Sequence, residues 1–131
     1  MNKPIENRED IRLLVESFYA KVKRDEIIGD IFNNTLFFSW DTHIPIMIDF
    51  WETILLGATS YQGNTMKVHT DLDKKYPLQP AHFERWKKLF FETLDEHFTG
   101  ENVAEAKRRA ELMAMLISGK IEHSRRPGFI R

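Results

Sequence analysis

The chain has 131 residues, is 42% hydrophobic and 30% charged, and carries a formal net charge of −1 at pH 7. Its length predicts a single domain, residues 1–131, that can bury a core or enclose a ligand. The near-neutral charge argues against nucleic-acid binding, which needs a basic excess. The lack of cysteine excludes disulfides and thiolate-ligated metal sites.

The N-terminal region predicts two helices. Apolar residues recur at helical spacing from Ile11 to Val22 after an N-cap at Asn7, which places Tyr19 on the buried stripe. One or two further turns are expected from Ile27 to Phe32, and the pair Asn33-Asn34 ends them.

A third helix is expected in the middle of the chain. It begins at Asp41 or Thr42, carries Pro45 in its first turn and ends at Gly57. A short helical piece surrounded by loops is expected next, with the helical piece at 66–69 and the loops at 58–64 and 71–79.

Two more helices are predicted in the C-terminal half. The fourth runs from Pro80 to Gly100 with an apolar stripe that includes Trp86. The spacing of Asn102 and Glu105 predicts a capping box at the start of the last helix, and a frayed basic tail is expected at 124–131. The polar N-terminus lacks the apolar stretch of a secretory signal, and no run of about 18 apolar residues is present. We therefore expect a cytoplasmic protein with no membrane contact.

The residues whose side chains could bind a ligand or a metal each allow more than one interpretation. His69 lies in a poorly periodic segment, where it could be a solvated loop residue or a haem ligand of the globin kind. His43 could be a surface residue near a helix start. Tyr19 and Trp86 lie on separate apolar stripes, and each could be a core side chain with a backbone partner. Aromatic residues make up 12% of the chain, which suits either a packed core or a flat apolar slot.

Several spaced motifs together resemble one family. They are H-I-P-I-M-I-D-F-W at 43–51, Y-Q-G-N at 61–64 followed by His69, and H-F-E-R-W-x-x-L-F at 82–90, with F-Y-A-K-V and I-F-N-N near the N-terminus. This set resembles group III truncated haemoglobins, from about Ile11 to Ile121.

The resemblance implies an all-α fold, a two-over-two sandwich of helices around a haem b. His69 would be the proximal iron ligand. Tyr19 and Trp86 would be the distal hydrogen-bonding pair, and His43 would be the distal gate. Four further residues would contact the porphyrin or line its pocket: Phe32, Met47, Phe50 and Trp51.

A polar distal pocket of this kind predicts a protein that binds oxygen, nitric oxide and carbon monoxide. Two hydrogen-bond donors would slow oxygen release, which suits redox chemistry on oxygen, nitric oxide or peroxide better than transport. Nitric oxide dioxygenase-like or peroxidase-like activity would need an external reductase. The alternatives are a globin for oxygen storage or sensing, and a haem-free helical interaction domain.

Overall fold

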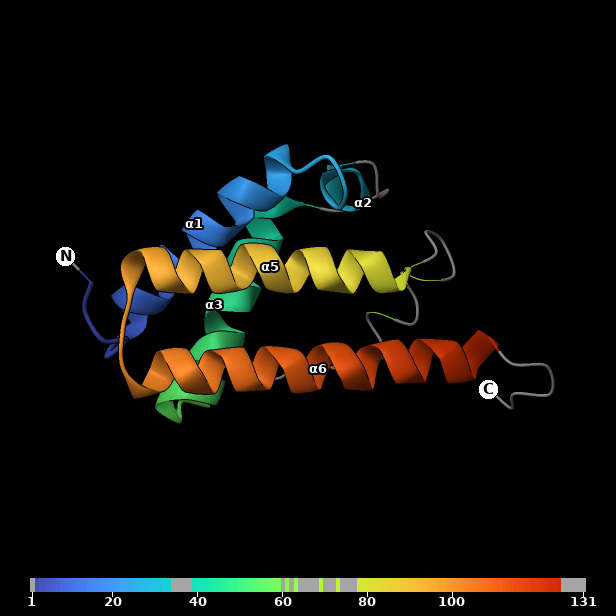
Figure 1. Cartoon of the computed structure of the whole chain (residues 1–131). Coiled ribbons are helices and arrows are strands. Elements are labelled where there is room, and N and C mark those ends of the chain that lie inside the picture. The colour runs from blue at the N-terminus through green and yellow to red at the C-terminus, as the bar shows by residue number, and fades with distance from the viewer. Residues whose placement is uncertain are drawn as a thin grey trace.

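The computed structural model describes residues 2–33, 39–59, 61, 63, 69, 73 and 78–125. Its helices are α1 (Arg8–Arg24), α2 (Gly29–Asn33), α3 (Trp40–Leu56), α5 (Pro80–His97) and α6 (Glu101–Arg125). In Figure 1, α5 and α6 lie side by side in one layer, and α3 crosses behind them and packs against α1. This is the predicted all-α, two-over-two helical sandwich. None of the described helices is both long and apolar enough to span a membrane.

The predicted ends of two helices are confirmed. Asn7 caps α1, because its side-chain oxygen accepts a hydrogen bond from the Asp10 N–H at 3.0 Å. Gly57 follows α3 in the left-handed region with φ 75°, a conformation that glycine adopts without a steric cost.

The predicted start of α3 is wrong by one or two residues. The helix begins at Trp40 with Ser39 as its N-cap, so Pro45 lies in the second turn rather than the first. A proline there removes one hydrogen bond of the helix. Trp40 is half-buried against the rings of Tyr19 and Phe32, contacts that local sequence patterns do not reveal.

Three boundaries in the C-terminal half also differ from the prediction. Helix α5 ends at His97, before Gly100. Asn102 does not cap α6, because the helix already begins at Glu101; its side-chain amide instead donates at 2.7 Å to the carbonyl oxygen of Ile5 in the N-terminal segment. The tail is not frayed at its start, since α6 continues through Arg125. Residues 126–131 lie outside the described residues, as does most of the segment predicted as loop at 71–79, within which Asp73 is helical.

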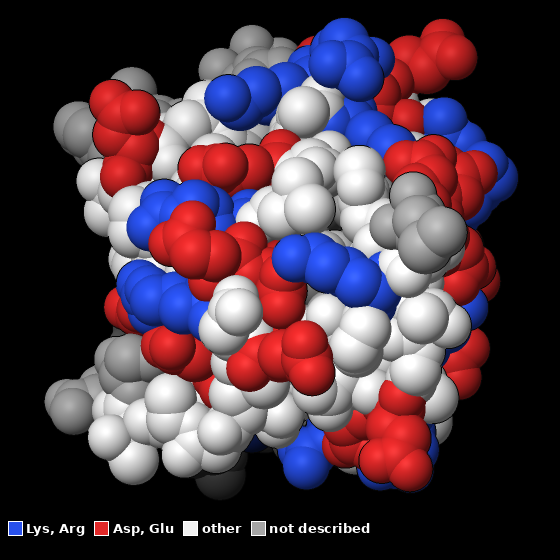
Figure 2. All heavy atoms as spheres, turned by 90° about the vertical axis from the view of Figure 1, so that its left-hand side faces the viewer, with Lys and Arg blue, Asp and Glu red and all other residues white. Residues whose placement is uncertain are grey.

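The core lies between the two layers of helices. The inward stripe of α1 is almost fully buried, and Phe18 packs edge-on against Phe90 of α5 with ring centroids 5.2 Å apart. Alanines on the inner face of α6 are buried, and small side chains let neighbouring helices approach closely. Most charged side chains lie at the surface, whereas Asp10 and Asp73 are buried. Figure 2 shows both signs interspersed over the side of the molecule that it presents.

Candidate functional site

A buried hydrogen bond joins α1 to α5. Tyr19 is 3% exposed, and Trp86 is half-buried on the facing helix. Indole can only donate, so the Trp86 N–H donates to the phenol oxygen of Tyr19. Burial raises the pKa of the Tyr19 phenol by more than the bond from Trp86 lowers it, so the phenol stays protonated at neutral pH. Since the phenol oxygen accepts this bond, its own O–H can still donate to a ligand.

Three further rings surround the phenol of Tyr19. The ring centroids of His43, Trp40 and Phe32 lie 4.9, 5.5 and 6.0 Å from it. Sequence reasoning named His43 and Phe32 but missed Trp40, which also has Lys23 Nζ 4.9 Å above its ring. Had Ser39 been predicted as the N-cap of this helix, Trp40 would have been recognised as a site residue, because it would then lie one turn before His43 on the same face.

Two histidines from different segments interact at this site. His43 lies on α3, and His69 is half-buried in a helical conformation. Burial first, and then the charge of His69, lower the pKa of His43 from its ordinary 6.5 to about 4. The imidazole of His43 is therefore neutral at pH 7, the form in which one nitrogen donates and the other accepts.

The other three predicted pocket residues lie further along α3. Met47 is half-buried against the core. Phe50 packs edge-on against Trp51, and its ring centroid is 5.0 Å from that of Tyr61. Trp51 is stacked on Phe90 at 4.8 Å and is 2% exposed, so within the described part of the chain it is a core residue one ring removed from Trp86.

An ion pair fixes the distance between the helices that carry Tyr19 and Trp86. Asp25 follows α1, and its carboxylate accepts from the N–H groups of Ile27 and Ile28 and from Arg85 Nε at 2.7 Å. Burial alone would raise the pKa of Asp25, but these hydrogen bonds and the Arg85 charge hold it below its ordinary value. The pair therefore anchors the end of α1 beside Trp86.

Replacing Arg85 with glutamine is expected to lower the free energy of unfolding at pH 7 by about 1–3 kcal/mol, because Asp25 would stay buried without its counter-charge. In the wild-type protein the pKa of Asp25 is lower when folded than its unfolded value of 3.8. Its stabilising contribution is thus complete above that value and is lost as the pH falls through the folded pKa. Urea denaturation of both proteins at pH 7 and at acidic pH measures this. Equal stability at pH 7 would contradict the anchoring role.

The chemistry of these side chains fits a haem. Haem is a flat, largely apolar group that needs an axial base and an apolar slot with few polar groups. The described residues provide two interacting imidazoles, one phenol and one indole among aromatic rings. A two-over-two helical sandwich with this site defines the class of the truncated globins.

Comparisons with known proteins identify the family within that class. No family model matches the chain. The group 3 truncated hemoglobin of Campylobacter jejuni is 38% identical over 111 residues, which cover 82% of this chain and 85% of that one. The crystal structure of group III truncated hemoglobin from Campylobacter jejuni matches with a TM-score of 0.82 and 35% identity, over 92% of this chain and 95% of that one. The chain belongs to the group III truncated haemoglobins, which makes it a globin-family haem protein.

Proposed function

We propose that the chain binds one haem b through His69 and serves redox chemistry on oxygen, nitric oxide or peroxide. The haem would supply an iron that binds a diatomic ligand and exchanges electrons with it. Because the chain has no cysteine, no thioether bond can attach the porphyrin. A separate reductase would deliver the electrons for repeated turnover.

The observation that carries this proposal is the buried phenol of Tyr19, which is 3% exposed, has the His43 ring centroid 4.9 Å away and has the Trp86 indole as its donor. A phenol that accepts a bond from indole becomes a stronger donor, since hydrogen bonds in a chain polarise one another. Its O–H would then hold a ligand that gains negative charge on binding, at about 1.5–3 kcal/mol for a charge-assisted bond. One such bond slows ligand release by roughly tenfold or more.

The neighbouring side chains would orient the ligand and exclude water. His43 packs against the Tyr19 ring and is neutral at pH 7, so it can act as a gate or as a second donor without bringing a charge into the pocket. Phe32 and Trp40 close the same side with apolar rings. Firm retention of the ligand suits its chemical conversion, whereas a storage protein must release it.

Nitric oxide consumption under air tests the redox function. The haem-loaded protein, supplied with a chemical electron donor, should consume nitric oxide well above the rate in a chain-free solution and form nitrate. Tyr19→Phe should consume it more slowly, because the ligand would be released before it reacts. Reversible oxygen binding with no consumption above the chain-free rate would contradict the redox function and favour storage.

A further inference from the structure

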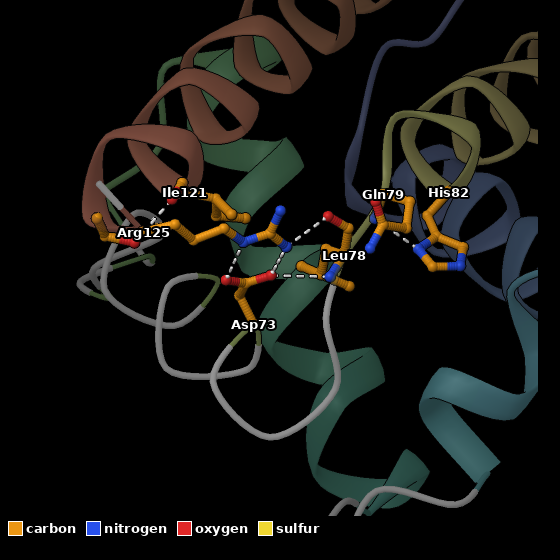
Figure 3. Close-up of polar contacts among 7 residues, drawn as sticks. Asp73, Leu78, Gln79, His82, Ile121 and Arg125 are labelled. Atoms are coloured by element: carbon orange, nitrogen blue, oxygen red, sulfur yellow. Dashed lines mark hydrogen bonds and ion pairs between the residues drawn. The ribbon is translucent and has the colours of Figure 1, made fainter. Parts of the chain in front are cut away.

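A buried carboxylate lies close in sequence to His69. Asp73 is 6% exposed and is helical, like His69. Its carboxylate pairs with the guanidinium of Arg125 through Nε at 3.0 Å and through Nη2. It also accepts a hydrogen bond from the Leu78 N–H at 2.8 Å. Figure 3 shows these groups converging on Asp73 from the end of α6 and from the residues just before α5.

The guanidinium of Arg125 holds Leu78 as well as Asp73. Its Nη2 donates to the Leu78 carbonyl oxygen at 2.9 Å, so one planar side chain contacts two positions five residues apart in sequence. Burial alone would raise the pKa of Asp73, but Arg125 and the Leu78 N–H outweigh it and hold the pKa below its ordinary value. Asp73 is therefore ionised at neutral pH and stays bound to Arg125.

The same contacts continue into the start of α5. Gln79 follows Leu78 directly and is the N-cap of this helix. Its backbone N–H donates at 2.8 Å to Nδ1 of His82, and its side chain accepts from the His82 N–H. Figure 3 shows the bond from the Gln79 N–H to His82 beside the ion pair. The end of α6 is thus linked to the first turn of the helix that carries Trp86.

His69 and Asp73 are four positions apart in the sequence, so their Cα atoms lie at most about 14 Å from each other. We therefore expect a displacement of Asp73 to change the position of the neighbouring segment that bears His69. The Asp73 carboxylate is buried but the Arg125 side chain is 42% exposed, so solvent weakens their attraction and the pair by itself adds little stability. What the pair adds is a fixed geometry, because both oxygens of Asp73 and both polar groups of Leu78 are engaged at once.

We propose that the Asp73–Arg125 ion pair is a positioning device that fixes the orientation of His69 toward the iron. This inference rests on the proposed function, in which His69 is the proximal ligand. Residues that orient a metal ligand without touching the metal typically change metal affinity by about 10- to 100-fold when they are replaced. We expect an effect of that size on haem retention.

Two variants of the full-length haem-loaded protein test the proposal. Arg125→Gln removes the cation, and Asp73→Asn removes the charge while keeping the side-chain volume. The matched control is Lys3→Gln, since Lys3 pairs at 2.6 Å with Asp10, a carboxylate that is just as buried but lies at the start of α1. Arg125→Lys tests rescue, because an ammonium can pair with Asp73 without the planar fork that also reaches Leu78.

Three measurements are compared across these proteins. Transfer of haem to apomyoglobin should be about tenfold faster or more for Arg125→Gln and Asp73→Asn, unchanged for Lys3→Gln and intermediate for Arg125→Lys. The iron–histidine stretching band of the ferrous protein should shift or broaden in the first two variants alone. In the haem-free protein, the Leu78 amide should exchange faster in these two variants, which reports the clamp independently of haem.

Unchanged haem transfer and an unchanged stretching band in Arg125→Gln and Asp73→Asn would overturn the proposal, even if both variants unfold more easily. Failure of the proposed function looks different. If the proposed function is wrong, the wild-type chain takes up no haem, or His69→Ala keeps the wild-type stretching band. Either result would also remove the basis for a positioning role toward His69.

Discussion

Replacing His69 with alanine is expected to weaken haem binding by more than about 100-fold, beyond the 10- to 100-fold effect of losing an outer-shell partner of a metal ligand. A ring nitrogen of His69 would be the protein atom bonded to the iron, and alanine has no side-chain atom that can bind iron in its place. Titration of haem into the apoprotein, followed by the absorption spectrum, measures the affinity. Haem that the variant still holds should have a changed axial ligand.

Two controls separate iron ligation from folding. His123→Ala removes an exposed histidine from α6 and should leave the affinity unchanged. Free imidazole added to His69→Ala should restore a wild-type-like ferrous spectrum, because it can occupy the position of the missing ring. Full haem retention with an unaltered spectrum in His69→Ala would show that another residue holds the iron.

Replacing Tyr19 with phenylalanine is expected to accelerate oxygen dissociation by at least about tenfold, the equivalent of one hydrogen bond of about 1.4 kcal/mol or more. The ring that packs against Phe18 and His43 is preserved, and only the hydroxyl is lost. Stopped-flow displacement measures the rate. Carbon monoxide is the internal control, since it is much less polar when bound and should respond far less. Equal acceleration of both ligands would mean that Tyr19 acts by packing alone.

The partner of Tyr19 can be tested in the same way. Trp86→Phe keeps an aromatic ring stacked on Phe90 and removes the indole N–H that bonds to the phenol. Oxygen release should accelerate in this variant, and the double variant with Tyr19→Phe should show less than the sum of the two single effects. Additive effects would mean that the two side chains act separately. An oxygen release rate unchanged from wild type would make Trp86 a core residue.

Local patterns in the sequence were sufficient to predict where the helices lie, but not to predict the residues at which several of them begin or end. The apolar spacing of α1 follows directly from burial of one face, so it placed Tyr19 correctly. Asn102 is of a residue type that favours the N-cap, yet it lies inside α6, and its amide N–H donates to the Ile5 carbonyl oxygen, 97 positions away along the chain. No local pattern can reveal such a long-range contact.

The site was predictable to the extent that single side chains can be matched to a family. The resemblance named Tyr19, Trp86 and His43, and the structure brings them into contact. It gave no reason to expect the pairing of Asp73 with Arg125, because these residues lie 52 positions apart and meet only when the end of α6 folds back on the chain. Ion pairs between distant segments depend on tertiary packing, which periodicity does not encode.

The most direct test of the account is the crystal structure of the haem-loaded protein. We expect the iron to be bonded to His69, with Tyr19, Trp86 and His43 together on the opposite face of the porphyrin. An iron bonded to His43, or a haem whose open face is turned away from the Tyr19 hydroxyl, would contradict it.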